Sequence, residues 1–256
     1  MRSIRTSDKP VIGTALQYGH SLTNGLVDCW MLGEQSLSQA RNALTGQSST
    51  STIIPPASGS LMGLSRVFDG ATSNRFLDNS VQVLSNGTDY TVWCYFIPTA
   101  IGAIMSLVDS DDNLTERMFQ LRTNASNQFE FIAFNTVGSS FSATSSITFF
   151  QGKPNTLAGT VRGTAVNVWA NGVLHGSATL TGTLRSSAST IRLGLRLAIS
   201  NPFTGNLLIA ARWNRALTNM EIAQLHASPY SMFAGQPSNA TYIVTNSTGV
   251  RIGVAA

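Results

Sequence analysis

The stretch from Tyr90 to Ile97 constrains the fold more than any other part of this sequence. It reads Tyr-Thr-Val-Trp-Cys-Tyr-Phe-Ile, and it ends at Pro98, which cannot donate to a central ladder. Aromatic and β-branched residues favour strands, and apolar residues here occupy both alternating faces. We therefore expect a central strand that is buried on both sides.

The other strand patterns are short and closely spaced. Asn171-Gly172 separates two of them, and this pair is a strong hairpin signal because both turn residues must take positive φ. Such spacing is typical of an all-β sandwich or barrel, and of these we expect an antiparallel sandwich of two sheets. The remaining strands are expected at 26–32, 65–70, 104–108, 117–122, 127–134, 155–162, 165–170, 173–176, 191–197 and 205–213.

One helix is predicted near the C-terminal end of this series, at residues 218–227. Thr218 and Glu221 have the spacing of a capping box, in which each side chain satisfies a backbone amide at the helix start. Pro229 ends the pattern. The helix is too short to form a layer alone, so we expect it to lie over one edge of the sandwich.

The composition suits one large β domain. Of the 256 residues, 43% are hydrophobic and only 11% are charged, which allows a sizeable core. The net charge is +4, but the arginines are scattered from Arg2 to Arg251 and the only lysines are Lys9 and Lys153. Because nucleic-acid binders gather basic residues into a patch or stripe, we expect no nucleic-acid partner.

The two ends of the chain differ from its middle. Residues 1–24 have few periodic apolar positions and are expected to form an N-terminal arm, residues 25–230 the sandwich, and residues 231–256 a C-terminal extension. Asp8 and Lys9 interrupt any signal-peptide pattern. No apolar run reaches the roughly 18 residues of a membrane-spanning helix. We expect folding in the cytoplasm and no membrane contact.

Six landmarks occur in an order that resembles one family. They are Asn-Gly-Leu-Val-Asp-Cys-Trp at 24–30, Phe-Asp-Gly at 68–70, the aromatic strand at 90–98, the Asn-Gly hairpin at 168–173, Phe-Thr-Gly at 203–205, and Arg-Ala-Leu-Thr with Glu-Ile at 215–222. Across residues 24–230 this order is similar to the laminin-G-like jelly rolls of the concanavalin A-like lectin/glucanase superfamily. Tyr95 stands where that family usually has tryptophan. The resemblance implies a jelly-roll sandwich, a fold that hosts many functions.

Catalysis is not expected. Glucanases of this superfamily carry a Glu-x-Asp-x-x-Glu strand, whose carboxylates act as nucleophile and acid. No serine stands in a Gly-x-Ser-x-Gly nucleophile elbow either. We therefore assign no catalytic residue and no cofactor. The glutamates that lie outside any such motif are Glu34, Glu116, Glu130 and Glu221.

A metal site is also not favoured. Asp109, Asp111 and Asn113 imitate the first ligands of a calcium loop, but Leu114 replaces its glycine and Gln120 its bidentate glutamate. A solvated acidic turn is the favoured interpretation. The resemblance leaves one alternative open, a structural calcium near Asp109 or Asp111, because laminin-G-like domains often hold one at a loop rim.

Cys29 and Cys94 both fall within strand patterns and lack metal-binding spacing. We interpret them as reduced, buried thiols, with a disulfide between neighbouring strands as the alternative. The tryptophans are interpreted as core residues, with a sugar-stacking platform as the alternative. They are Trp30, Trp93, Trp169 and Trp213.

These features lead to one functional hypothesis and two alternatives. The hypothesis is a non-catalytic bacteriophage virion protein, such as a capsid decoration protein, because a virion is assembled in the host cytoplasm and acts outside it. The opening at residues 18–27 also resembles laminin-G-like domains of phage and prophage proteins. The alternatives are a carbohydrate-binding module of an extracellular bacterial or phage adhesin, and a divergent hydrolase.

The expected partners follow from the two ends of the chain. Apolar residues alternate in two strand-like segments, at 241–244 and 250–254. Strands of this kind can add to the open edge of a neighbour's sheet, so we expect residues 231–256, together with residues 1–24, to contact other copies of the protein and shell proteins. Cell-surface glycans are a further candidate partner. Folding of the extension back onto its own sandwich is the alternative.

Overall fold

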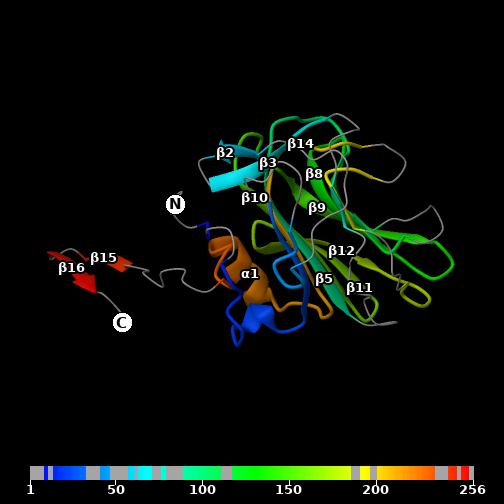
Figure 1. Ribbon diagram of the computed structural model, residues 1–256. Coiled ribbons are helices and arrows are strands. Elements are labelled where there is room, and N and C mark those ends of the chain that lie inside the picture. The colour runs from blue at the N-terminus through cyan, green and yellow to red at the C-terminus, as the bar shows by residue number, and fades with distance from the viewer. Residues whose placement is uncertain are drawn as a thin grey trace.

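The computed structural model describes the backbone of most of the chain. The described residues are 9–10, 14–32, 41–46, 57–60, 63–70, 76–78, 89–110, 117–185, 191–196, 201–233, 242–246 and 249–253. Two antiparallel sheets pack face to face in these residues (Figure 1). No helix within these ranges is long and apolar enough to cross a membrane.

The larger sheet has eight strands, in the order β12-β11-β10-β5-β14-β3-β2, with β1 also paired to β14. The predicted strand at residues 90–97 is β5, and it lies in the middle of this sheet between β10 and β14. The strands are β1 (Leu26–Met31), β2 (Ala57–Ser60), β3 (Gly63–Asp69), β5 (Tyr90–Pro98), β10 (Asn155–Arg162), β11 (Ala165–Ala170), β12 (Val173–Thr179) and β14 (Thr204–Trp213).

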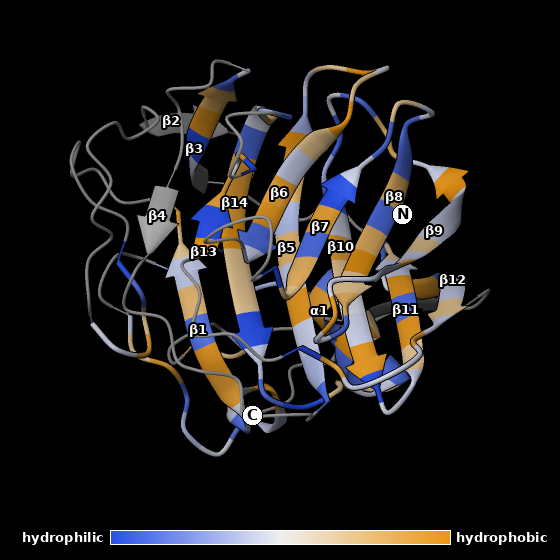
Figure 2. Ribbon diagram, turned by 90° about the vertical axis from the view of Figure 1, so that its right-hand side faces the viewer, coloured by the Kyte–Doolittle hydropathy of each residue, from blue (hydrophilic) through white to orange (hydrophobic). Residues whose placement is uncertain are grey.

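The smaller sheet has six strands, in the order β4-β13-β6-β7-β8-β9. Figure 2 shows its strands lying across those of the larger sheet. The predicted all-β sandwich of two antiparallel sheets is confirmed. The strands are β4 (Phe76–Asp78), β6 (Met105–Ser110), β7 (Phe119–Thr123), β8 (Gln128–Phe134), β9 (Ser140–Thr148) and β13 (Ile191–Leu193).

The main core lies between the two sheets and is rich in phenylalanine. Phe96 of β5 stacks edge-on against Phe129 of β8, with ring centroids 6.4 Å apart. Gly159 of β10 lies so close to the ring of Phe131 that a Cβ there would be 2.1 Å from it. The sheets therefore meet at the spacing of a tightly packed interior, where side chains interdigitate without voids.

A second apolar cluster covers the outer side of the eight-stranded sheet. It joins the outward residues of β5 and β14 to a 3₁₀ turn, η2 (Ser21–Thr23), to the helix α1 (Asn219–Ala227) and to residues 228–233. Because β5 contributes to both clusters, its predicted burial on two faces is confirmed. All four tryptophans are buried in these clusters, so none of them is exposed as a platform for a sugar.

Residues 14–24, which belong to the expected N-terminal arm of residues 1–24, pack against this same layer. Leu16 and Leu22 are buried, and Leu16 forms a β-bridge with Phe233. The amide of Gln17 donates to the carbonyl of Met232 at 2.8 Å. The few apolar residues in this segment are therefore anchors, although they show no period in the sequence.

The two cysteines lie on opposite faces of the eight-stranded sheet. Cys29 of β1 belongs to the outer cluster and Cys94 of β5 to the core between the sheets. Strand β14 separates them, since Ala211 pairs with Cys29 and Ala210 with Cys94. A disulfide needs adjacent Cβ atoms that point toward each other, so this arrangement excludes one and agrees with two reduced thiols.

The C-terminal extension contains a hairpin of β15 (Tyr242–Asn246) and β16 (Gly249–Gly253), which pair in register from Tyr242 opposite Gly253 to Asn246 opposite Gly249. This agrees with the two strand-like segments predicted there. Figure 1 shows the hairpin to one side of the sandwich. Within the described residues, its strands pair with each other and with no strand of the two main sheets.

Candidate ligand-binding face

The outer sides of the two sheets differ in what they offer to a ligand. The outer side of the eight-stranded sheet is occupied by η2, α1 and residues 228–233. The outer side of the six-stranded sheet carries polar side chains on β7 and β9, together with Ile132 and Phe134 of β8, which are buried outside the core between the sheets. Along β9 the outward residues all bear hydroxyl groups and are exposed, and they are Ser140, Ser142, Thr144, Ser146 and Thr148.

Strands β7, β8 and β9 place a group of polar side chains at the same level. Arg122 of β7 pairs with Glu130 of β8, which pairs with Thr144 of β9. Side chains alternate between the faces of a strand, so Phe119, Leu121, Phe129 and Phe131 enter the core while their neighbours point outward. We call the outward group the polar face. It consists of Gln120, Arg122, Glu130, Ser142 and Thr144.

The side chains of the polar face bind one another. Arg122 donates from Nε to Oε2 of Glu130 at 2.5 Å, and from Nη1 to Oε1 of Gln120 at 3.3 Å. The other oxygen of Glu130 accepts from Ser142 at 2.6 Å and from Thr144 at 3.5 Å. Gln120 is buried and the Arg122 and Glu130 side chains are 17% and 12% exposed, so the network is held in place and reaches water mainly beside Ser142 and Thr144, which are exposed.

An exposed aromatic residue follows the hydroxyl row of β9. Phe149 turns into the core, and Phe150, the next residue, is 60% exposed. Asn155 fixes this loop, because its side-chain amide donates to the carbonyls of Phe150 at 3.0 Å and of Lys153 at 2.7 Å. Phe150 therefore offers an exposed apolar ring in a defined position at the end of the hydroxyl row, and sites for small polar ligands combine such rings with polar groups.

Asp109 does not lie in a solvated turn, which corrects that interpretation for the first of residues 109–113. It is the fifth residue of β6, its exposure is 0%, and Ser106 donates to its Oδ2 at 3.2 Å. The strand continues to Ser110 because the β6–β7 pairing extends that far, to Phe119. Asp111 and Asn113 lie outside the described residues. Among the residues described, no three metal-binding side chains form a group.

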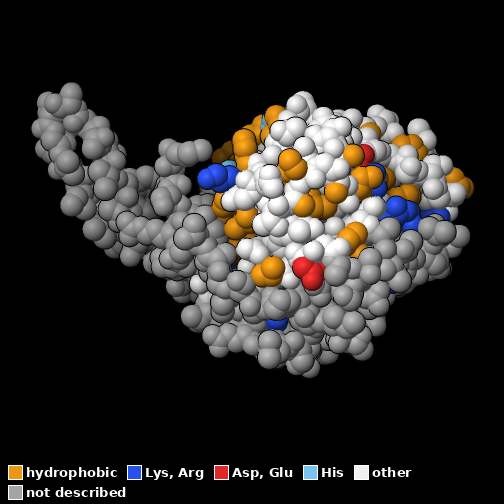
Figure 3. All heavy atoms as spheres, turned by 90° about the horizontal axis from the view of Figure 1, so that it is seen from above, with side chains coloured by type: hydrophobic (Ala, Val, Ile, Leu, Met, Phe, Trp, Pro, Cys, Tyr) orange, Lys and Arg blue, Asp and Glu red, His pale blue; other side chains and the backbone are white. Residues whose placement is uncertain are grey.

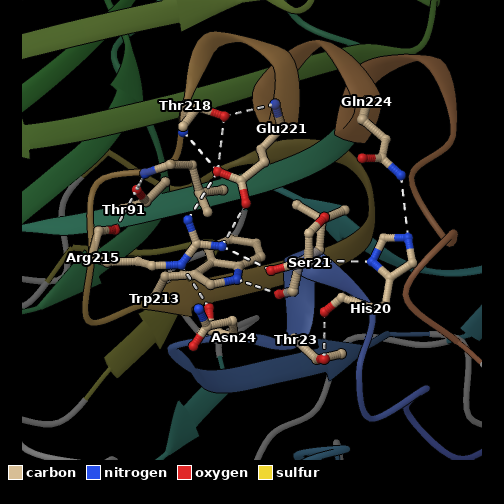
Figure 4. Close-up of polar contacts among 12 residues, drawn as sticks. His20, Ser21, Thr23, Asn24, Thr91, Trp213, Arg215, Thr218, Glu221 and Gln224 are labelled. Carbon is tan, nitrogen blue, oxygen red and sulfur yellow. Dashed lines mark hydrogen bonds and ion pairs between the residues drawn. The ribbon is translucent and has the colours of Figure 1, made fainter.

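Glu221, by contrast, has a structural role at the start of α1, and the predicted capping box is confirmed. Arg215 binds both of its carboxylate oxygens, at 2.7 and 2.9 Å, and also donates to the carbonyls of Ser21 and Asn24 (Figure 4). The hydrogen bonds from Arg215, followed by those from Thr218, lower the pKa of Glu221 to about 2. This cluster clamps the helix to η2. Glu34 and Glu116 lie outside the described residues.

The histidines also serve local contacts. His20 caps η2 and lies 3.2 Å from the side-chain amide of Gln224 in α1 (Figure 4). His175 is 3.3 Å from the Ser146 hydroxyl. His226 is 3.0 Å from the hydroxyl of Thr156, and burial lowers its pKa. The three rings lie in different contacts, and none of these contacts includes a glutamate of the polar face.

Sequence reasoning considered Glu130 only as a catalytic carboxylate and did not find the polar face. The sequence does show Gln120 and Arg122 alternating with apolar neighbours, which indicates two outward polar side chains on one strand. Which other side chains lie next to them depends on which strands pair. Residues 120 and 144 share a face only because β8 lies between β7 and β9.

The two antiparallel sheets with one closing helix define a lectin-like β-sandwich. The sequence profile of the laminin G type described as "Concanavalin A-like lectin/glucanases superfamily" matches residues 69–223, more than half of the chain. The chain belongs to this superfamily. No curated protein sequence matches it closely enough to count as a relative.

Several solved structures share the fold at low sequence identity. Domain 4 of AbnA, an extracellular arabinanase from Geobacillus stearothermophilus solved with arabinotriose, is 16% identical with a TM-score of 0.55, and the match covers 78% of this chain and 98% of that one. The receptor binding domain of botulinum neurotoxin D is 10% identical with a TM-score of 0.63, and 82% and 54% are covered. Trypanosoma rangeli sialidase is 13% identical with a TM-score of 0.60, and 82% and 34% are covered. The chain thus spans about half of the toxin domain and a third of the sialidase.

Proposed function

We propose that this domain binds a carbohydrate at the polar face and does not hydrolyse it. Two observations carry the proposal: the network of Arg122, Glu130 and Ser142 on the polar face, and the exposed ring of Phe150 in the loop that follows β9. Guanidinium, carboxylate and hydroxyl groups suit sugar hydroxyls, which both donate and accept hydrogen bonds. An aromatic ring suits the apolar side of a sugar ring. The arabinanase domain solved with arabinotriose supports this proposal by its fold.

The first experiment measures binding by calorimetry, with arabinotriose and then a panel of neutral and acidic oligosaccharides. Phe150→Ala should weaken binding about tenfold, because one stacking contact contributes about 1–1.5 kcal/mol. Its thermal unfolding should stay unchanged, since the ring is exposed. Val137→Ala is the matched control, because Val137 is 82% exposed in the turn at the opposite end of β8 and β9.

Two results would count against the proposal. One is that no saccharide of the panel binds to the folded protein. The other is that Phe150→Ala and Val137→Ala have the same effect on binding. Release of reducing sugar from the panel, lost on Glu130→Gln, would contradict the non-catalytic part.

A structural role in a bacteriophage virion, as a capsid decoration or surface protein, is a second candidate. It is favoured by the β15–β16 hairpin, whose strands pair only with each other in the described residues. A two-stranded hairpin is marginally stable in water on its own, so contact with another copy or a shell protein would stabilise it. In this role the protein is located in the virion; as a binding module alone it acts outside the cell.

Removal of residues 234–256 tests this second role. Phe233 is the last residue of the apolar cluster on the eight-stranded sheet, so the shortened protein keeps both clusters and should fold. If the hairpin mediates assembly, light scattering should show an oligomer for the full chain and a monomer for residues 1–233. An unchanged oligomeric state would contradict the role of the hairpin.

A further inference from the structure

The two charged side chains of the polar face neutralise each other. Arg122 and Glu130 are in register on neighbouring strands and form an ion pair with a distance of 2.5 Å between Nε and Oε2. We infer that the polar face selects uncharged glycans over glycans that carry carboxylates, such as sialic or uronic acids. This inference rests on the proposed function and specifies its ligand class.

The guanidinium of Arg122 is the group that an acidic sugar would need. Arginine recognises carboxylates with two parallel N–H donors. Here Nε already donates to Glu130 and Nη1 to Gln120. A ligand carboxylate bound to Arg122 would have to displace the carboxylate of Glu130 or lie next to it. Two carboxylates that share one guanidinium are close enough to repel each other.

The carboxylate of Glu130 favours a ligand that donates hydrogen bonds. An ionised carboxylate only accepts, and it can accept about four bonds. Arg122, Ser142 and Thr144 supply three of them in this structure. A sugar hydroxyl can replace or join the hydroxyls of Ser142 and Thr144, which are both exposed, whereas a ligand carboxylate has no proton to donate.

The hydroxyl row beside the ion pair is also uncharged. Charged residues make up 11% of the chain, and the exposed row on β9 consists of serine and threonine. Figure 3 shows a different face, seen from above the view of Figure 1, and among the residues coloured there charged side chains are few. A hydroxyl row gives little long-range attraction to an anionic glycan, since attraction of this kind requires a concentrated field of one sign, and the exposed Lys153 in the Phe150 loop is a single charge.

The experiment compares neutral and acidic probes on the wild type and on one isosteric variant. Arabinotriose and a neutral gluco-oligosaccharide should bind the wild type, and 3′-sialyllactose and trigalacturonate should bind at least about tenfold more weakly. Glu130→Gln removes the negative charge and leaves Arg122 uncompensated. Its affinity for the acidic probes should rise about tenfold, which corresponds to one charge-assisted hydrogen bond, and the gain should diminish with salt.

Glu221→Gln is the matched control. It changes the net charge of the protein by the same amount, but Glu221 belongs to the helix clamp and not to the polar face. It should leave the preference between neutral and acidic probes unchanged. Equal shifts in both variants would show that net charge, and not the Arg122–Glu130 pair, sets the preference, which would overturn the inference.

Failure of this inference differs from failure of the proposed function. If the wild type binds acidic probes more tightly than neutral ones, the inference is wrong and the proposed function stands. If no probe of either kind binds to the folded wild type, both are wrong. If Glu130→Gln stays folded by circular dichroism and gains no affinity for the acidic probes, the assigned role of the pair is wrong.

Discussion

Arg212 and Asp28 face each other on neighbouring strands, β14 and β1, and form an ion pair that solvent does not reach. The side chains are 2% and 0% exposed. Arg212 donates to Oδ2 of Asp28 from Nε at 2.8 Å and also from Nη2, and the amide of Asn42 donates to Oδ1 at 2.8 Å. The pair therefore joins the first strand of the sandwich to the last one along the chain through groups that have lost their hydration.

We predict that Asp28→Asn strongly destabilises the protein. The substitution keeps the size of the side chain but removes the carboxylate charge that Arg212 binds, and breaking a buried ion pair from one side typically costs about 3–5 kcal/mol. Urea unfolding measures the free energy. Arg122→Met is the control, because it breaks an ion pair between neighbouring strands that is partly exposed, and it should cost about 1 kcal/mol or less. Equal costs for the two variants would contradict this prediction.

This pair also shows where sequence reasoning ends. The central strand, the hairpin at Asn171-Gly172 and the helix after Thr218 could be predicted because their signals are local: a run of apolar residues, a turn pair and a capping box. An aspartate at position 28 gives no such signal. Its burial depends on Arg212, which lies 184 positions away.

The candidate site was missed for the same reason. Gln120, Arg122 and Glu130 are polar residues that alternate with apolar ones along their strands, which is common in β-sheets. They form one network only because the register of β7 and β8 places Arg122 opposite Glu130. Residues 14–24 were expected to be an arm because two anchors, Leu16 and Leu22, make no periodic pattern. Long-range pairing decides both cases, and it cannot be read from local propensity.

We predict that the clamp of α1 weakens in acid. The pKa of Glu221 is lowered from 4.5 to about 2, first by its hydrogen bonds from Arg215. A carboxyl with a lowered folded-state pKa stabilises the protein fully above its unfolded pKa, and this stabilisation is lost as the pH falls through the folded value. The loss therefore lies between pH 4.5 and about 2. It should amount to about 1 kcal/mol, since water screens a partly exposed pair.

The urea midpoint at several pH values within this window measures the effect. Glu221→Gln should be less stable than the wild type above pH 4.5 and should approach it near pH 2. If the two proteins instead lose stability in parallel over the whole window, Glu221 is not the titrating group.

We predict that both thiols are inert in the folded protein. Cys29 and Cys94 are buried, and burial raises the pKa of each well above that of a free thiol. The thiolate is the reactive form, so neither residue should react with a thiol reagent at neutral pH until the protein unfolds. Titration with an aromatic disulfide should detect no thiol in buffer and two in denaturant. Migration on a gel should be the same with and without reductant.

The hydroxyl of Tyr95 is buried beneath the apolar cluster that η2, α1 and residues 228–233 form on the eight-stranded sheet. Its ring packs edge-on against Tyr230, with centroids 6.4 Å apart, and neither hydroxyl has a hydrogen-bond partner within the described residues. Burial raises the pKa of Tyr95 to about 12. A buried hydroxyl without a partner retains a desolvation cost of about 1–3 kcal/mol, and phenylalanine removes it without changing the ring.

We therefore expect Tyr95→Phe to raise the melting temperature by about 2–4 °C, which corresponds to about 1 kcal/mol in a protein of this size. Tyr18→Phe is the control, because Tyr18 is 77% exposed and its hydroxyl is hydrated in both the folded and unfolded states. Its melting temperature should not change. A lower melting temperature for Tyr95→Phe would contradict the prediction and show that the hydroxyl makes a hydrogen bond, to a buried water or to a residue outside the described ranges.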